Sequence, residues 1–256
     1  MSEATASLNG IEMHYEIHGE GQPLVLLHGF TGIGRDWQSF VPDLSREYRL
    51  IVPDLRGHGL STNPAGEFTH RQSALDVFAL LDQLGIETFR AIGVSCGGNN
   101  LLHMATRQPR RVEAMVIVSA TSYYPEPARA VMRRYSLDRL SPAEWDFLRQ
   151  RHPQGDEQIR ALWAQGNGFK DSYDDMSFTP PLLSTITART LIVSGDRDPL
   201  YPPRIALEMH EAIPGSHLWI VPNGGHGPIW GPWRDRFLET AASFLRGTWP
   251  PPAALG

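Results

Sequence analysis

Short apolar runs that end in turn-forming residues alternate along this chain with segments of helical spacing. The runs are residues 24–27, 50–52, 89–94, 112–118, 191–193 and 218–221. They are apolar on both faces, which is typical of strands covered by helices on each side. The helical segments are residues 73–84, 99–107, 203–212 and 233–245. We therefore predict an α/β fold, with a mostly parallel central sheet and helices on both of its faces.

The beginning of the chain has a different pattern. Residues 6–8 and 11–18 read as strands and flank Asn9-Gly10. This dipeptide tolerates the positive φ angles that tight hairpin turns require. An antiparallel hairpin is therefore expected at one edge of the sheet.

Residues 121–184 interrupt the alternation, because they contain no convincing strand pattern. They carry many charged residues together with Tyr123, Tyr124, Tyr135, Trp145, Phe147, Trp163, Phe169, Tyr173 and Phe178. We predict a helical cap inserted over the strand ends, with aromatic side chains facing the sheet and charges facing water. The predicted division is an α/β core in residues 1–120 and 185–256 with the cap in residues 121–184. The tail 249–256, rich in Pro and Ala, is expected to be frayed.

Composition narrows the class of partner. The 256 residues carry a net charge of -5, which disfavours nonspecific binding to nucleic acid. The single cysteine, Cys96, forms no internal disulfide, so a reducing cytoplasm is expected. The polar start with Glu3 does not resemble a secretory signal, and the apolar runs are too short to span a bilayer. A small-molecule substrate is expected, and the sequence does not predict an oligomeric state.

One motif carries chemistry in its local context. Gly93-Val94-Ser95-Cys96-Gly97-Gly98 follows an apolar strand and precedes a helical pattern, as a nucleophile elbow does. A sharp strand-to-helix turn exposes the serine hydroxyl, and side chains at Gly93 or Gly97 would collide with the neighbouring strand and helix. The N–H groups at the start of the helix favour negative charge above Ser95. The alternative is an ordinary Gly/Ser-rich turn.

With four further motifs, the chain resembles the α/β-hydrolase family over nearly its whole length. These motifs are His28-Gly29-Phe30, residues 54–61, residues 195–199 and Gly225-His226-Gly227, each after a predicted strand. The resemblance implies a Ser-His-Asp triad in the chain order nucleophile, acid, histidine. Ser95, Asp198 and His226 have that order. The serine disfavours the dehalogenase and epoxide hydrolase branches, which use an aspartate nucleophile.

A serine hydroxyl needs a base, and His226 is the candidate because it lies between glycines in a loop after an apolar run. His28 is expected to be a structural turn residue. His58 belongs to a Gly-rich turn and His103 to the helix behind the elbow. The remaining histidines are expected in exposed or edge positions: His14, His18, His70, His152, His210 and His217.

The imidazole in turn needs a carboxylate. Asp196 and Asp198 both follow the strand at residues 191–193, and either could instead cap the next helix. The family spacing from Gly195 selects Asp198. A rarer family arrangement places the acid after the strand ending near Ser119, but residues 121–125 contain no acidic side chain.

The resemblance also implies an oxyanion hole formed by the backbone N–H groups of Phe30 and Cys96, so that Cys96 is not expected to be a reactive thiol. His210-Glu211 lacks the second histidine of a zinc helix motif, and no nucleotide-binding loop is present. No metal and no cofactor are predicted.

The predicted function is hydrolysis of a small carboxylic ester, with an apolar or aromatic acyl group, through an acyl-enzyme on Ser95. A carbon–carbon bond hydrolase, a lactonase, an amidase or a perhydrolase could use the same triad. A non-enzymatic receptor or regulator on the same fold is the alternative from a different class.

Overall fold

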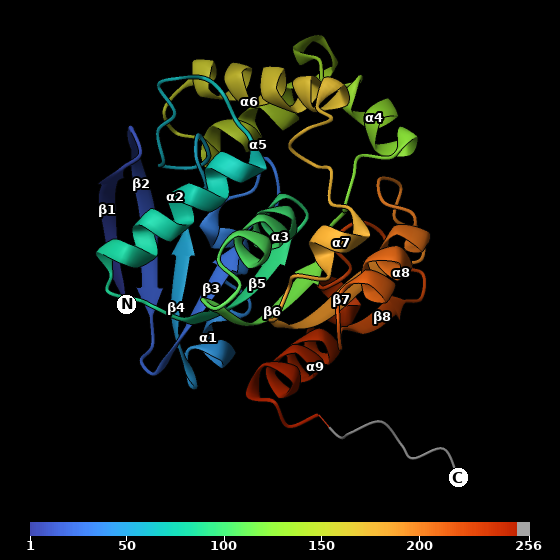
Figure 1. Cartoon of the computed structure of the whole chain (residues 1–256). Coiled ribbons are helices and arrows are strands. Elements are labelled where there is room, and N and C mark those ends of the chain that lie inside the picture. Colours follow the sequence, from blue (N-terminus) through green and yellow to red (C-terminus); the bar gives the residue numbers. More distant parts are fainter. Residues whose placement is uncertain (250–256) are drawn as a thin grey trace.

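The computed structural model describes residues 1–249, and in this part of the chain eight strands form one sheet (Figure 1). Its order is β1-β2-β4-β3-β5-β6-β7-β8; β1 and β2 run antiparallel to their neighbours and all other pairs are parallel. The strands are β1 (Ser2–Leu8), β2 (Ile11–His18), β3 (Gln22–Leu27), β4 (Tyr48–Pro53), β5 (Phe89–Val94), β6 (Val112–Val118), β7 (Arg189–Gly195) and β8 (His217–Val221). The predicted fold class is confirmed.

The hairpin forms at the edge of the sheet where it was predicted. Asn9 and Gly10 have φ angles of 44° and 76°, so both occupy the left-handed region that a tight two-residue turn requires. Leu8 pairs directly with Ile11 across this turn. The predicted frayed tail, apart from Trp249, lies outside the described residues.

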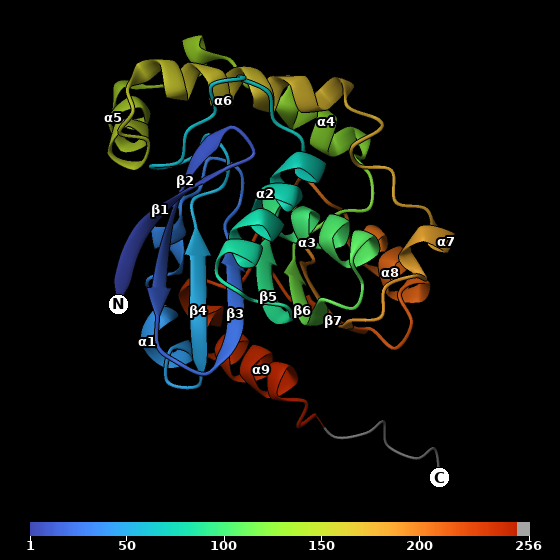
Figure 2. The same ribbon diagram turned by 60° about the vertical axis from the view of Figure 1, so that its left-hand side comes forward.

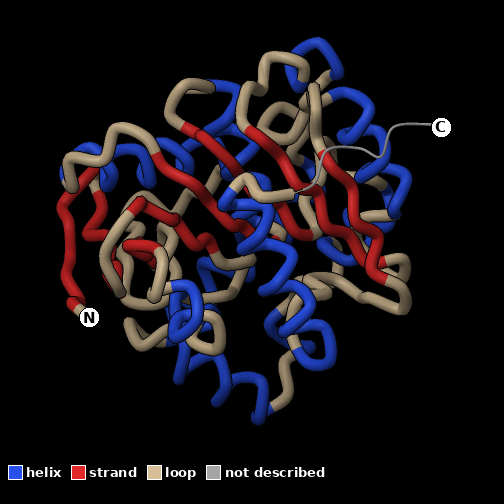
Figure 3. Tube along the Cα trace, turned by 90° about the horizontal axis from the view of Figure 1, so that it is seen from below, coloured by secondary structure: helices blue, strands red, loops and turns tan. Residues whose placement is uncertain are grey.

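Helices cover both faces of the sheet (Figures 1 and 3). They are α1 (Val41–Leu44), α2 (His70–Gln83), α3 (Cys96–Arg107), α4 (Glu126–Met132), α5 (Pro142–Arg151), α6 (Asp156–Gly168), α7 (Pro180–Leu183), α8 (Pro203–Ala212) and α9 (Arg234–Arg246). Residues of α2, α3 and α8 share one apolar core, whereas residues of α1 and α9 belong to the other. Val25 and Leu27 of β3 face the first core, and Leu24 and Leu26 face the second. Two-sided burial explains why the strands read as continuous apolar runs.

Two helices begin three residues earlier than the periodicity predicts. Helix α2 begins at His70 because the Thr69 side chain caps it, accepting a hydrogen bond of 3.0 Å from the Gln72 amide. Helix α3 begins at Cys96, directly after Ser95. Both starts are set by the turn before the helix, which apolar periodicity does not report.

Helices α4, α5 and α6 lie over the end of the sheet to which the parallel strands point (Figure 2). The predicted inward orientation of the aromatic residues in this region holds for Phe169 and Phe178, which are buried. It is wrong for Phe147 and Tyr173, which are 57% and 66% exposed. The guanidinium of Arg151 lies over the Phe147 ring, 5.0 Å from its centre, and that of Arg129 lies over the Tyr173 ring, 4.0 Å from its centre. These cation–π contacts stabilise the two rings in their exposed positions. The predicted division into residues 1–120, 121–184 and 185–256 stays a prediction.

Helix α7 packs against α3 and α8, beside the sheet rather than over its end. Within residues 1–249, no helix combines the length and the apolar character needed to cross a bilayer.

Candidate active site

Ser95 occupies the turn between β5 and α3 in a strained backbone conformation. Its φ and ψ are 53° and -113°, a region that non-glycine residues rarely adopt and that costs about 1–3 kcal/mol. The surrounding structure holds it there, because the Ser95 amide donates to Val118 of β6 at 2.8 Å and its carbonyl accepts from Asn99 of α3 at 2.9 Å. The turn therefore has the geometry of a nucleophile elbow.

The glycines of the elbow are required by contact distances. A Cβ atom at Gly97 would lie 2.3 Å from the carbonyl oxygen of Leu27, and one at Gly93 would lie 2.5 Å from the backbone of Gly97. Both distances are far inside van der Waals contact and involve backbone that cannot yield easily. These two positions let β5, β3 and α3 approach closely enough to form the turn.

An imidazole–carboxylate pair lies at the ends of β7 and β8. Nδ1 of His226 is 2.8 Å from Oδ2 of Asp198. The other oxygen of Asp198 accepts hydrogen bonds from the amides of Leu200 at 2.8 Å and Tyr201 at 3.1 Å. Burial would raise the pKa of Asp198, but these hydrogen bonds outweigh it and lower the pKa below its usual value. An ionised carboxylate only accepts, so Nδ1 carries the proton and Nε2 keeps a lone pair.

Asp196, the competing acid, is in a different environment. Its side chain is 35% exposed and lies 3.9 Å from the guanidinium of Arg197. The structure thus brings Asp198 to His226, whereas Asp196 lies near the exposed side chain of Arg197.

The loop of His226 docks beside the elbow. The amide of Gly227 donates to Oγ of Ser119 at 2.9 Å, and a Cβ atom at Gly227 would lie 3.4 Å from the side chain of Val94. The Tyr201 ring packs 5.3 Å from the His226 ring and borders the same cavity as Ser95. Among residues 1–249, no hydrogen bond joins the Ser95 hydroxyl to His226. Such bonds are often long in enzymes without a bound substrate.

The two predicted oxyanion donors flank Ser95. Cys96 is the first residue of α3, and a Cβ atom at Gly29, next to Phe30, would lie 3.6 Å from Cβ of Ser95. Within the described part of the chain, neither the Phe30 nor the Cys96 amide donates to a protein acceptor. Burial raises the pKa of the Cys96 thiol, so this side chain stays protonated and uncharged.

Comparison with known proteins identifies the family. A family model described as alpha/beta hydrolase fold matches residues 22–145, and a second, described as TAP-like protein, matches residues 174–247. The chain belongs to the α/β-hydrolase family.

The names of proteins similar to this α/β hydrolase refer to more than one reaction. The serine hydrolase BPHL of Mus musculus is 27% identical, over 96% of this chain and 87% of the relative. A 2-hydroxymuconate semialdehyde hydrolase of Pseudomonas sp. (strain CF600) is also 27% identical, over 85% of this chain and 84% of the relative. A solved thermophilic esterase from Thermogutta terrifontis has a TM-score of 0.76 and 25% identity, covering 96% of this chain and 99% of that one.

The cavity beside Ser95 in this α/β hydrolase is small and mostly aromatic. It measures about 50 Å³ and is lined by residues of the elbow, of α2, of α4 and of the loops above the sheet. The aromatic residues in its lining are Phe30, Tyr124, Tyr135, Phe169 and Tyr201. A cavity of this size favours a small acyl group over a ring or a long chain.

His28 has the structural role expected for it. Its Nε2 accepts from the Leu55 amide at 2.9 Å, and its Nδ1 lies 2.7 Å from the carbonyl oxygen of Gly29. Burial lowers its pKa, so the ring stays neutral. Its bonds connect the loop carrying Phe30 to the segment after β4.

The histidines predicted in exposed or edge positions include three that the α/β hydrolase buries. His14, His70 and His152 are 8%, 1% and 0% exposed, respectively. His152 accepts from the amide of Gly59 at 3.0 Å and thereby joins the end of α5 to the core. His14 lies near Asp54, and His70 contacts Asp175. Because these partners are distant in the sequence, the polar local sequence did not indicate the burial of the three histidines.

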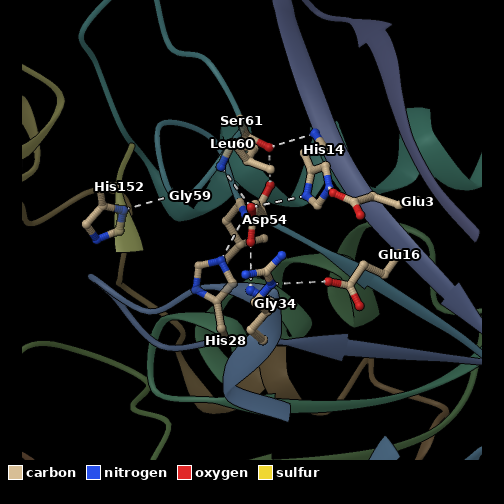
Figure 4. A network of polar contacts seen from close by, with 12 residues as sticks. Glu3, His14, Glu16, His28, Gly34, Asp54, Gly59, Leu60, Ser61 and His152 are labelled. Carbon is tan, nitrogen blue, oxygen red and sulfur yellow. Dashed lines mark hydrogen bonds and ion pairs between the residues drawn. The ribbon is translucent and has the colours of Figure 1, made fainter. Parts of the chain in front are cut away.

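Asp54 organises the loops behind the site (Figure 4). It accepts hydrogen bonds from the amides of Gly34 at 2.7 Å and Leu60 at 2.9 Å, and His14 Nδ1 lies 3.2 Å away. Burial opposes ionisation, yet His14, His28 and the two amides lower the pKa of Asp54 from 3.8 to about 2. The folded state therefore favours the ionised carboxylate.

We expect Asp54→Asn to lower the free energy of unfolding at pH 7 by about 2 kcal/mol. Because the folded pKa lies below the unfolded one, this stabilisation is present above pH 3.8 and is lost as the pH falls towards 2. Urea unfolding of both proteins at pH 7, 5, 4 and 3 measures the difference, which should narrow only below about pH 4. Asp138→Asn, at an exposed position, is the control. A deficit that is the same at pH 3 and pH 7 would contradict the proposed role of the charge.

Proposed function

We propose that this α/β hydrolase is a serine esterase that cleaves esters of short acyl groups. Ser95 is the nucleophile, His226 the general base and Asp198 the carboxylate that orients the imidazole. The observation that carries the proposal is the Asp198–His226 pair, whose hydrogen bond of 2.8 Å leaves the lone pair on Nε2. The strained backbone of Ser95 and the docking of the His226 loop against β5 and β6 support it.

The reaction proceeds in two steps. Oγ of Ser95 attacks the ester carbonyl carbon while Nε2 of His226 takes the hydroxyl proton. The amides of Phe30 and Cys96 donate to the oxyanion, and one such donor contributes about 3–4 kcal/mol. The proton passes to the leaving alcohol, and the acyl group stays on Ser95. Water then attacks this acyl-enzyme, His226 accepts its proton, and the carboxylic acid leaves as the proton returns to Oγ.

The cavity limits the acyl group. A volume of about 50 Å³ with an aromatic lining favours a two-carbon acyl group over a ring or a long chain. This narrows the expected apolar or aromatic substrate to short acyl esters. The aromatic side chains then form the apolar wall against which the acyl group packs.

Carbon–carbon bond hydrolysis is the second candidate. The relative named 2-hydroxymuconate semialdehyde hydrolase supports it at the same identity as the relative named serine hydrolase. Such a substrate is longer than the cavity beside Ser95, so this reaction needs a wider opening between α4 and the elbow.

A fluorophosphonate label combined with an ester series tests the proposal. We expect one label per chain in the tryptic fragment 91–107, where Ser95 is the only serine. The kcat/KM for p-nitrophenyl acetate should exceed that for p-nitrophenyl octanoate by at least about tenfold, because the octanoyl chain is larger than the cavity and must displace its lining. Heat-denatured protein is the control. A label on another residue, or labelling without any ester turnover, would contradict the esterase.

A further inference from the structure

A second imidazole–carboxylate pair is buried near Ser95, and its imidazole lines the cavity beside that residue. His70 begins α2, and Asp175 lies in the segment between α6 and α7. Nδ1 of His70 is 2.9 Å from Oδ2 of Asp175, and the two residues are 1% and 8% exposed. The proposed reaction uses neither residue, so their burial beside the nucleophile requires another explanation.

Asp175 fixes the proton on the His70 ring. The carboxylate also accepts from the amides of His70 at 2.6 Å and Arg71 at 3.0 Å. Burial would raise its pKa, but His70 and these amides lower it to about 2. An ionised carboxylate is an acceptor only, and Nδ1 of His70 therefore carries the hydrogen.

Asn99 lies beside Nε2, the other ring nitrogen of His70. Oδ1 of Asn99 accepts from the Thr121 amide at 3.0 Å, so its NH₂ group is the end that faces Nε2 of His70, at 3.4 Å. A donor facing Nε2 is compatible with a lone pair on that nitrogen. The contact is long for a hydrogen bond, which leaves the lone pair available to a better donor.

His70 belongs to the lining of the space that an acyl group would occupy. His70, Asn99 and Ser95 line the same cavity of about 50 Å³. The Tyr124 hydroxyl lies 3.4 Å from Nε2, and most of the remaining lining is apolar or aromatic. In a largely apolar pocket, a few polar groups determine which ligand is recognised.

We infer that His70 selects the acyl group, accepting a hydrogen bond at Nε2 from a hydroxyl of a hydroxyacetyl ester. A hydroxyacetyl group adds one hydroxyl to the acetyl group and stays among the smallest acyl groups, which suits a cavity of about 50 Å³. The inference rests on the proposed esterase function and adds a substrate class to it. His70 is a specificity residue that contacts the substrate, and Asp175 and Asn99 position its ring.

The test compares phenyl glycolate with phenyl acetate in the wild type and in His70→Phe, which keeps a planar ring and removes the acceptor. We expect the variant to lower the kcat/KM ratio of glycolate to acetate about fivefold to tenfold, the effect of one hydrogen bond. Phenyl acetate is the reference substrate, because it lacks the donor and reports any general effect of the substitution on the site. A purely structural role would lower both esters alike and would overturn the inference.

His103→Phe is the matched control. His103 Nε2 lies 3.5 Å from the other oxygen of Asp175, and it borders a different cavity behind α2 and α3. The same substitution there should leave the glycolate-to-acetate ratio unchanged. An equal change of the ratio in both variants would also overturn the inference.

A binding measurement separates this inference from the esterase proposal. Glycolamide and acetamide are titrated into wild-type protein while the ¹⁵N resonances of the histidine rings are followed. Glycolamide should bind at least about threefold more tightly and shift Nε2 of His70. Equal binding, or no shift of that nitrogen, overturns the inference whether or not esters are turned over. If neither ester is hydrolysed but glycolamide still binds more tightly than acetamide, only the esterase proposal is overturned.

Discussion

Ser95→Ala is expected to lower kcat/KM for phenyl acetate on the order of 10⁵-fold. Without the hydroxyl no acyl-enzyme forms, and His226 can only assist direct attack by water. The amides of Phe30 and Cys96 remain in place, so a small residual rate above the uncatalysed reaction should persist. Steady-state kinetics with purified protein measure the loss, and unchanged urea unfolding would show that the fold is intact.

Cys96→Ala provides the control next to the nucleophile. Its proposed contribution is the backbone N–H, and the thiol is buried with a raised pKa. Removing the thiol should therefore change kcat/KM less than about threefold. If Cys96→Ala abolishes activity, or if Ser95→Ala retains a tenth of it, Ser95 is not the nucleophile.

Asp198→Asn is expected to lower kcat on the order of 10⁴-fold. Oδ1 of Asp198 accepts from two backbone amides, so the oxygen of an asparagine would stay on that side. Its NH₂ group would then face Nδ1 of His226, and the ring would place its hydrogen on Nε2. An imidazole with that tautomer cannot take the proton from Ser95.

Asp196→Asn isolates this effect from a change of charge near the site. Asp196 is two residues away, and its carboxylate lies 3.9 Å from the guanidinium of Arg197. We expect its kcat to stay within about twofold of the wild type, as for most exposed substitutions. Proton NMR of the histidine rings would report the tautomer of His226 in both variants. Equal losses in the two variants would mean that the acid has been assigned to the wrong residue.

Much of the nucleophile turn could be predicted because its causes are local. Gly93 and Gly97 are read directly from the chain, and the contact of Gly93 with the start of α3 follows from the strand–turn–helix itself. The Asn9-Gly10 hairpin was predictable for the same reason, since its φ angles depend on two adjacent residues. The approach of Gly97 to Leu27 of β3 is a tertiary contact. Helix starts were less accurate, because capping by Thr69 does not alter apolar periodicity.

Local sequence was a poor guide to the histidines. His70 and His152 have polar neighbours in the chain, yet each lies against groups from distant segments. Asp175 is 105 positions from His70, and its own neighbours Asp174 and Ser177 indicate an exposed loop. A closer reading of the isolated polar residues in the predicted cap could have raised Asp175 as a candidate, but no spacing rule connects it to α2.

By itself, the sequence determined the α/β architecture and the order of Ser95, Asp198 and His226, because apolar periodicity and turn residues act over a few neighbouring positions. The tertiary structure decided which aspartate meets His226, how little space lies beside Ser95, and that His70 borders that space. These properties depend on side chains from separate strands and helices meeting at one end of the sheet. Their distances follow from packing of the whole chain, which no local pattern encodes.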